Sequence, residues 1–364
     1  MAELRSGYST GTCAAAAAKA ALIKLLYNRD EPVVGIDLPQ GGRVELPIKS
    51  CRIENDAAVA EVIKDAGDDL DVTHGISILS RVEITGKPGV IIKGGLGIGV
   101  VTKPGLSVPV GEPAINPIPR SMITFEAERL LPPGKGAFIT VFAPQGLEVA
   151  SKTLNSKLGI VGGISIIGTT GLVRPMSKKA YLDALVLQIN QAINQSQKVL
   201  VLTPGAIGAR MAVKHGINEE AIIQTSNFIG DMLKKCNEYE ITGIMLFGHI
   251  GKLIKVAAGI YNTHSQIADG RRETMAAHAA LMGAPQKAIK EIMELNTIED
   301  STDLIKRYKL EAVYQSIARS VSYKCRQLAN EGIIIGSVLY DLKGHILGYD
   351  EEACILGRKL GWKI

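Results

Sequence analysis

The sequence predicts two domains of different class, an α+β domain over residues 1–150 and an α/β domain over residues 151–364. A length of 364 residues exceeds what one compact core usually serves. The chain is 46% hydrophobic but only 4% aromatic, with 39 glycines, so aliphatic side chains do the packing and glycine shapes the turns. Up to about residue 150, short β-like runs separated by turns dominate. After Ser151 the pattern changes to strand, glycine turn and helix.

A hydroxyl-rich turn precedes an alanine run close to the N-terminus. Ser9, Thr10 and Thr12 can each offer an oxygen to the free N–H groups of a first helical turn, and residues 14–18 are all alanine. Cys13 lies where a helix dipole favours a thiolate. This segment is therefore predicted to be a helix that is either well capped or built to bind an anion.

Strands are predicted at residues 33–38, 43–48, 57–63, 76–84, 90–92 and 137–142, from runs rich in β-branched residues. Gly41 and Gly42 predict a hairpin between the first two. Residues 122–131 read as a helix that Pro132 stops. The proline-rich loop 103–120 is long for a compact domain, which favours a functional loop or a rigid covering strap.

In the second half, a helix with Leu182 and Leu185 on its apolar face can be capped by Ser177. Strands at residues 199–202 and 244–247 each run into a glycine turn and a helix, which indicates parallel strands with helical crossovers. A long helix over residues 310–329 then leads into a strand at residues 333–340.

Ligands of parallel α/β sheets bind beyond the carboxyl ends of the strands, so the turns at residues 204–208 and 248–252 are candidate sites. The glycine-rich segments 94–99 and 159–171 leave backbone amides open to a ligand, with Ser165, Thr169 and Thr170 as hydroxyl donors. The alternatives are tight strand-to-helix packing for the two turns, a bulged strand for residues 94–99 and a buried hinge for residues 159–171.

An acidic loop carries Asp65, Asp68, Asp69 and Asp71 and ends at His74. Carboxylates held close together raise one another's pKa and can yield a proton donor or acceptor near neutrality. The alternative is a solvated turn. Residues 261–273 also contain both acidic and basic side chains. Their arginines could bind carboxylates of a ligand, or the segment could be a surface loop with local salt bridges.

Several classes are disfavoured. A formal charge of +5, from 41 basic and 36 acidic residues, is small for this length and argues against nucleic-acid binding. The five scattered cysteines predict neither disulfides nor zinc and fit a reducing cytoplasm. The histidines show no metal-binding pattern, so we expect no metal site. No apolar run approaches the roughly 20 residues of a membrane span.

Five motifs together resemble the CbiD family. They are Gly-Tyr-Ser-Thr-Gly-Thr-Cys-Ala at 7–14, Ala-Gly-Asp-Asp-Leu-Asp-Val-Thr-His-Gly at 66–75, Val-Thr-Lys-Pro-Gly-Leu at 101–106 with Ala-Ile-Asn-Pro at 114–117, Gly-Gly-Ile-Ser-Ile-Ile-Gly-Thr-Thr-Gly at 162–171, and Gly-His-Ile-Gly-Lys at 248–252 with Thr-His-Ser at 263–265. They occur in the family's order over nearly the whole chain. Leu70 stands where the family often has proline, and Ala206 where asparagine is frequent, which puts a direct cofactor contact of the 204–208 turn in doubt.

The resemblance implies an α+β domain joined to a Rossmann-like domain of three layers. It implies methylation of C1 of cobalt-precorrin-5B, giving cobalt-precorrin-6A in anaerobic cobalamin biosynthesis, with S-adenosylmethionine as methyl donor and cobalt only as part of the tetrapyrrole substrate. An oligomer is compatible with it. The site residues that we expect fall into three groups: Asp68, Asp69 and His74 for proton handling; Ser9, Thr10, Thr12, Lys103 and Arg120 for the substrate; and Gly162, Gly163, Gly168, Thr169, Thr170, Gly171, Gly248, His249, Gly251 and Lys252 for the methyl donor. Lys252 could also serve as a partner of the substrate's carboxylates.

Two other functions compete with this interpretation. A noncatalytic corrinoid carrier could use the same glycine segments to hold a tetrapyrrole, but it would not bind S-adenosylmethionine. An NAD-dependent dehydrogenase is disfavoured, because no complete glycine fingerprint is followed at about 20 residues by an acidic residue.

Overall fold

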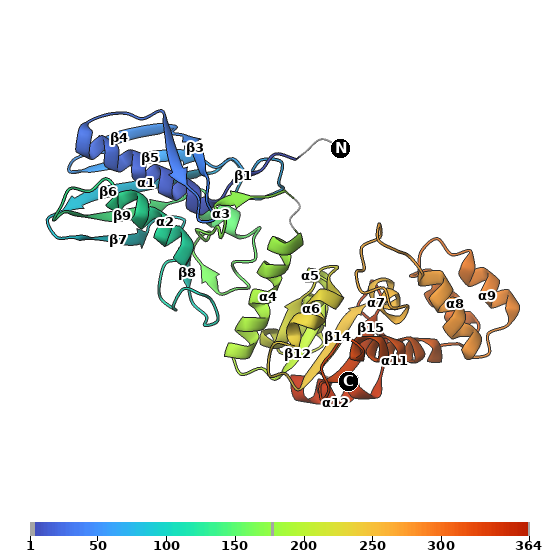
Figure 1. Cartoon of the computed structure of the whole chain (residues 1–364). Coiled ribbons are helices and arrows are strands. Elements are labelled where there is room, and N and C mark those ends of the chain that lie inside the picture. Colours follow the sequence, from blue (N-terminus) through green and yellow to red (C-terminus); the bar gives the residue numbers. More distant parts are fainter. Residues whose placement is uncertain (1–3, 176–177, 363–364) are drawn as a thin grey trace. The chain divides into compact units, whose positions relative to one another are not determined.

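A computed structural model describes residues 4–175 and 178–362 and divides the chain into two compact units, residues 1–178 and 179–364 (Figure 1). The sequence placed the boundary after residue 150. The difference arises because the segment after residue 150 pairs with strands of the first unit. Ser177, the predicted cap of a helix, lies outside the described residues.

The first unit is built on a five-stranded sheet in the order β4-β5-β6-β9-β7. The strands are β4 (Ser50–Glu54), β5 (Ala57–Ile63), β6 (Ser77–Thr85), β9 (Gly136–Phe142) and β7 (Gly89–Gly94). All neighbours are antiparallel except β7 and β9. The predicted hairpin at Gly41 and Gly42 is confirmed as β2 (Val33–Asp37) and β3 (Arg43–Pro47).

Helix α1 (Thr10–Tyr27) lies on β5 and β6 beside α2 (Pro117–Glu128). The alanines at positions 14–17 are fully buried, and their small side chains let the helix backbone approach the sheet closely. Helix α2 starts earlier than the predicted residue 122, because Pro117 provides a favourable first helical residue. A short helix α3 (Gly146–Ala150) follows β9.

Residues 159–173 form a glycine-rich ribbon that closes the first unit. In this ribbon β10 (Ile160–Val161) pairs with β8 (Val100–Val101), and β11 (Leu172–Val173) pairs with β1 (Gly7–Tyr8). Between these pairs, Ile164 and Ile166 bridge to two earlier segments of the unit. The ribbon is therefore part of the first unit's fold.

The second unit is built on a mainly parallel five-stranded sheet in the order β13-β12-β14-β15-β16 (Figure 1). Its strands are β12 (Val199–Thr203), β13 (Ile222–Gln224), β14 (Gly243–His249), β15 (Ile334–Tyr340) and β16 (Ile346–Tyr349), and only β16 is antiparallel to its neighbour. The chain order reverses between β12 and β14, so the loops after these two strands lead to opposite sides.

Helices cover both faces of this sheet and form one hydrophobic core on each face. Successive residues of β12 point alternately into these two cores. Leu200 and Leu202 pack with α4 (Lys178–Asn194), α6 (Ile229–Cys236), α7 (Ile250–Ala257) and α11 (Ala312–Arg326). Val199 and Val201 pack with α5 (Ala206–Lys214) and α12 (Glu351–Leu360). Helices α8 (Arg271–Leu281), α9 (Gln286–Met293) and α10 (Ser301–Arg307) extend the first of these cores, and η1 (Glu219–Ala221) precedes β13.

The structure thus has the mixed first unit and the mainly parallel second unit that the sequence predicts. A Rossmann-like relationship of the second unit stays a prediction.

Candidate functional site

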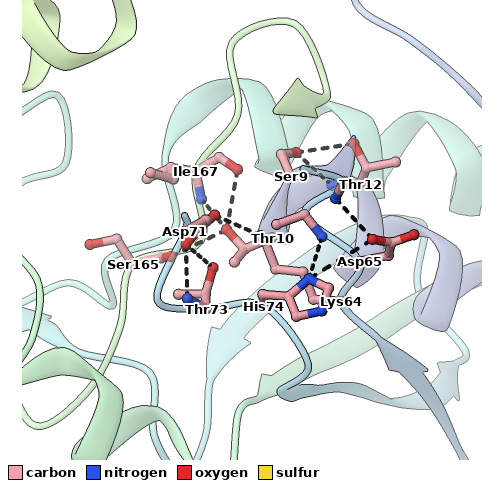
Figure 2. A network of polar contacts seen from close by, with 12 residues as sticks. Ser9, Thr10, Thr12, Lys64, Asp65, Asp71, Thr73, His74, Ser165 and Ile167 are labelled. Atoms are coloured by element: carbon pink, nitrogen blue, oxygen red, sulfur yellow. Dashed lines mark hydrogen bonds and ion pairs between the residues drawn. The ribbon is translucent and has the colours of Figure 1, made fainter. Parts of the chain in front are cut away.

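The first turn of α1 is closed by side chains of its own segment (Figure 2). Ser9 Oγ accepts a hydrogen bond from Thr12 N at 3.1 Å, which makes Ser9 the N-cap. Thr12 Oγ1 donates to the Gly171 carbonyl at 2.6 Å, and Thr10 Oγ1 accepts from Ile167 N at 2.8 Å. The three hydroxyl residues are at most 4% exposed. The predicted cap is confirmed, and the same hydroxyls join α1 to the ribbon. Their contact with substrate stays a prediction.

Beside this turn lies a buried ion pair. Lys64 is 1% exposed, and its Nζ lies 2.7 Å from Asp71 Oδ2. Asp71 Oδ1 accepts hydrogen bonds from Thr73 N and Thr73 Oγ1. Burial acts to raise the pKa of Asp71, but the positive charge of Lys64 and these hydrogen bonds outweigh it and hold the pKa below its ordinary value. Asp71 therefore stays ionised and is a poor proton acceptor.

A second carboxylate of the acidic loop is also held in its charged form. Asp65 accepts hydrogen bonds from the Arg5 guanidinium, and the two side chains form an ion pair. The Arg5 hydrogen bond, helped by one from Gly67 N, lowers the pKa of Asp65 to about 2. Like Asp71, Asp65 serves as a fixed negative charge in this loop.

His74 has a ring orientation set by the backbone. Its Nδ1 accepts a hydrogen bond from Ala66 N at 3.1 Å, so in the neutral ring the proton resides on Nε2. The side chain is 55% exposed. His74 is therefore arranged to donate a hydrogen bond from Nε2, and its one basic nitrogen is already engaged.

The other two predicted acid–base residues lie in the same loop. Asp68 is exposed, and its Oδ2 accepts a hydrogen bond from Arg5 N at 2.7 Å. Asp69 is half-buried. The structure thus places Asp68, Asp69 and His74 within one loop next to the start of α1, and their part in proton handling stays a prediction.

The two predicted substrate-binding cations of the proline-rich loop differ in their surroundings. Arg120 is held by backbone carbonyls of its own loop and of β7, because Nε donates to the Ile115 carbonyl at 2.9 Å and Nη1 to the Ile92 carbonyl at 3.3 Å. Lys103 is exposed and forms no hydrogen bond or ion pair within residues 4–175 and 178–362. Lys103 is thus the better placed of the two to meet a negatively charged ligand.

The predicted cofactor residues of the ribbon contribute mainly to packing. A Cβ at Gly163 would lie 2.1 Å from the Gly97 carbonyl oxygen, and one at Gly168 would lie 2.2 Å from Ser9 Oγ. Close contact of the ribbon with its neighbours therefore requires glycine at these two positions. Gly162, by contrast, has open space where a side chain would extend. Thr169 is exposed, Thr170 Oγ1 bonds within the ribbon, and Gly171 accepts the hydroxyl of Thr12.

In the second unit, a cavity of about 290 Å³ lies beyond the carboxyl ends of β13 and β14. It is lined by polar and basic residues that leave these strands or flank α7 and α8, namely Asn227, Gly251, Lys252, Lys255, Thr263, His264, Ser265 and Arg271. We call it the cationic cavity. Its position is the one at which parallel α/β sheets bind ligands.

Asn227 organises one wall of the cationic cavity. Its Oδ1 accepts hydrogen bonds from Lys252 Nζ at 2.7 Å and from Thr263 Oγ1 at 3.2 Å. Burial, followed by the charges of Lys255 and Arg271, lowers the pKa of Lys252. Lys255 is 2% exposed, and its Nζ donates to the carbonyls of Thr263 and Ala268. These bonds fold the loop before α8 over the cavity.

Arg271 forms a salt bridge with Asp269, so the local salt bridge that the sequence offered as one alternative for residues 261–273 is confirmed. Its guanidinium donates from Nε and Nη2 to both oxygens of Asp269, at 2.8 and 2.6 Å. This fork holds the pKa of Asp269 far below its ordinary value. The charge of Arg271 is thereby largely neutralised by its own neighbour.

His249 links the end of β14 to two other segments. Its Nδ1 accepts a hydrogen bond from Gly251 N and caps α7, while Nε2 donates to Glu299 Oε2 at 2.8 Å. The other oxygen of Glu299 accepts from Leu342 N, after β15. Gly248 is a packing glycine, since a Cβ there would lie 2.7 Å from Leu253. Of the residues predicted to bind the donor here, only Gly251 and Lys252 line the cavity.

Sequence reasoning missed Lys64, Asn227 and Lys255 as site residues. Lys64 lies two residues after Val62 of β5, so the alternation of side chains along an extended chain places it on the same buried face. Lys255 lies three residues after Lys252 on α7, a spacing that places both on one helical face. No local signal marks Asn227, whose role depends on a loop 36 residues away.

The described part of the chain holds neither a cluster of metal ligands nor a membrane-spanning helix. No group of three or more histidine, cysteine or acidic residues there could hold a metal ion. No helix within residues 4–175 and 178–362 is long and apolar enough to cross a membrane.

Comparisons with known proteins agree with the resemblance. The family model described as CbiD matches residues 1–175, and the model described as CbiD, C-terminal domain, matches residues 262–351. A Moorella thermoacetica protein named cobalt-precorrin-5B C(1)-methyltransferase is 45% identical over 353 residues, covering 96% of each chain. A protein of the same name from Methanocaldococcus jannaschii is 45% identical and covers 94% of this chain and 95% of its own.

Among solved structures, the cobalamin biosynthesis protein CbiD from Archaeoglobus fulgidus is 29% identical, with a TM-score of 0.39. The match covers 74% of this chain and 84% of that one. The near-complete coverage by relatives at 45% identity, together with the two family models, establishes that the chain belongs to the CbiD family.

Proposed function

We infer that this chain transfers a methyl group to C1 of cobalt-precorrin-5B, giving cobalt-precorrin-6A in cobalamin biosynthesis. The observation that carries this conclusion is 45% identity to a cobalt-precorrin-5B C(1)-methyltransferase over 96% of both chains. Cobalt enters this reaction as part of the substrate. In such a transfer the enzyme mainly positions the two reactants and excludes water, so the chemistry requires no covalent nucleophile from the protein.

S-adenosylmethionine is the proposed donor, and it supplies an electrophilic sulfonium methyl group when bound. We place it at the carboxyl ends of β12 and β14, where the order of strands reverses. Helix α5 begins there without a side-chain cap, so its first N–H groups can receive the donor's carboxylate. Gly205 precedes α5 with a φ of 106° and open space around it, which gives a ligand access to the backbone.

In the first unit, the acidic loop carries two carboxylates that are held in their charged form. Asp65 and Asp71 are held ionised by their cationic partners, and His74 presents an N–H. We therefore assign proton acceptance to the neighbouring carboxylates Asp68 and Asp69. His74 is assigned to a carboxylate side chain of the substrate, as is the exposed Lys103 of the proline-rich loop.

The experiment is anaerobic incubation of the full chain with methyl-labelled S-adenosylmethionine and cobalt-precorrin-5B, followed by NMR of the product. Label at C1 is expected, and label at any other ring position would overturn the assignment. Tight tetrapyrrole binding without methyl transfer or binding of S-adenosylmethionine would instead indicate a carrier. Calorimetry with S-adenosylmethionine, with and without the tetrapyrrole, separates these outcomes.

A further inference from the structure

The cationic cavity has an excess of positive charge that the described residues do not neutralise. Lys252 and Lys255 line it, and neither forms an ion pair with an acidic residue in the part of the chain that the structure describes. Arg271, the third cation, is forked onto Asp269. The unbalanced charge therefore comes from the two lysines.

We propose that the cationic cavity binds a carboxylate side chain of the tetrapyrrole substrate, and that it does not bind the methyl donor. This inference rests on the proposed function for the identity of the substrate. Of the two roles that the sequence offered for Lys252, it selects the contact with the substrate's carboxylates, and it also moves Gly251 from the donor to the substrate.

Lys255 is the strongest reason for an anion. An ammonium group at 2% exposure loses most of its hydration, and its two carbonyl partners return only part of that free energy. A carboxylate in the adjoining cavity would supply the missing opposite charge at short range, where the surrounding protein screens it less than water does. The ion pair would then be completed only in the complex.

The surroundings of Lys252 also favour an anion. Its Nζ is held at 2.7 Å from the neutral amide oxygen of Asn227, where an acidic partner would otherwise be expected. Burial, and after it the positive charges of Lys255 and Arg271, lower the pKa of Lys252, and no acidic residue among those that the structure describes forms an ion pair with it. A bound carboxylate would relieve this repulsion, so the site is arranged to gain stability from an anion.

Charge argues against the methyl donor, and size limits which part of the tetrapyrrole can enter the cavity. S-adenosylmethionine carries a sulfonium and an ammonium against one carboxylate, so its net charge is positive and the cavity repels it. Pockets that enclose a whole ligand usually measure roughly 300–1,000 Å³. At about 290 Å³ the cavity is too small for a tetrapyrrole with its acetate and propionate side chains, but it accommodates one such side chain.

The first test compares Lys252→Gln with wild type in the methyl-transfer assay. We expect the KM for cobalt-precorrin-5B to rise about 10- to 100-fold, the usual effect of losing a hydrogen bond to a charged group. The KM for S-adenosylmethionine should stay unchanged. Lys252→Arg keeps the charge and should retain most of the affinity. Lys287→Gln removes an exposed lysine from α9 and serves as the matched control for net charge.

Arg271→Gln is an independent variant. It removes one positive charge and frees the Asp269 carboxylate beside the cavity, so it should weaken tetrapyrrole binding at least as much as Lys252→Gln does. A rise in the KM for S-adenosylmethionine in either variant, with tetrapyrrole affinity unchanged, would overturn the proposal and assign the cavity to the donor.

A binding measurement separates this inference from the proposed function. Calorimetry on the full chain would use a cobalt corrinoid with free carboxylates and its fully amidated counterpart as probes. Wild type should prefer the free acid at least tenfold, and Lys252→Gln should reduce this preference. An equal preference in both proteins would contradict the cavity's role, even if C1 methylation is observed. If wild type prefers the free acid and Lys252→Gln reduces this preference, but no methyl transfer is observed, only the proposed function is contradicted.

Discussion

The ammonium group of Lys64 lies 2.7 Å from the carboxylate of Asp71, and the lysine side chain is 1% exposed while that of Asp71 is 24% exposed. This unequal burial means that the two residues are not equivalent when one is removed. A charge left on Lys64 has almost no access to water, whereas a charge left on Asp71 is partly hydrated.

Asp71→Asn should therefore lower the free energy of unfolding by about 3–5 kcal/mol, and Lys64→Met should lower it less. Urea-induced unfolding followed by circular dichroism measures both. The double variant should recover part of the loss, because no uncompensated charge remains. Equal losses in the two single variants would show that burial does not set the cost.

The same pair predicts loss of stability in acid. The folded pKa of Asp71 lies below its ordinary value of 3.8, so its stabilising contribution is complete above that pH. The contribution falls as the pH drops through the folded pKa. Wild type should thus lose stability below about pH 4 more steeply than Asp71→Asn does, as measured by thermal unfolding across pH. If the stability of both proteins falls equally steeply below about pH 4, Asp71 does not contribute to the loss of stability in acid.

Substitutions of Ser9 and Thr12 can distinguish a structural role at the start of α1 from contact with the substrate. Ser9→Ala removes the cap of α1 and should cost about 1 kcal/mol, while Ser9→Asp retains an acceptor and should cost less. Thr12→Val removes one of the two donors to the Gly171 carbonyl, which keeps its hydrogen bond from Ser9 N, and should cost about 1 kcal/mol. We expect a change in stability with little change in the KM for tetrapyrrole. A raised KM at wild-type stability would instead support the substrate contact predicted from the sequence.

His249 offers a corresponding test in the second unit. His249→Ala should lower the free energy of unfolding by about 1 kcal/mol, because α7 loses its cap. His249→Asn restores an acceptor for Gly251 N without the bond to Glu299, so it should recover the capping part of the loss. Chemical denaturation measures both variants, and failure of asparagine to restore any stability would assign the loss to the Glu299 contact.

The acid–base assignment predicts different kinetic effects in one loop. Asp69→Asn should lower kcat about 100-fold or more if this carboxylate accepts a proton. His74→Ala should chiefly raise the KM for tetrapyrrole, because the ring presents an N–H. Methyl transfer at saturating substrate measures both, with Asp68→Asn as the neighbouring comparison. Unchanged methyl transfer in all three variants would remove the acid–base claim.

Cys13 is predicted to be unreactive despite its place at a helix start. Burial raises the pKa of its thiol to about 12, and burial likewise raises the pKa of Cys236 and Cys325 to about 12. Alkylation of the native protein at pH 8 should therefore label none of these three rapidly, whereas unfolded protein should label all of them. Fast native labelling of Cys13, located by mass spectrometry, would contradict its burial.

Much of the fold could be predicted from local pattern. The alternation in β6 and β9 and the continuous apolar runs of β12 and β14 each appear in the sequence as they do in the structure. Strand β4 was missed because it is a short edge strand, in which only Cys51 and Ile53 are apolar and no residue is buried. The ribbon's place in the first unit depends on pairing between residues distant in sequence, such as Gly7 with Val173, which no local pattern reveals.

The candidate site was predicted in part. Hydroxyl residues before an alanine run indicate a helix cap, and Ser9 provides it. Their burial could not be foreseen, because it depends on the ribbon that covers them. Part of the cationic cavity was predicted from the sequence, through Gly251, Lys252 and the charged segment 261–273. Lys255 carries its charge inside the protein, a placement that sequence statistics disfavour for lysine.

The pairing of Gly7 with Val173 brings the beginning and end of the first unit together. Chain ends that are fixed side by side can be joined without distorting the fold, so a short linker could connect them and new termini could open elsewhere. The exposed hairpin turn at Gly41 and Gly42 is a suitable position for such an opening. Circular permutation would then show whether the order of segments along the chain, rather than their contacts, matters for assembling this unit.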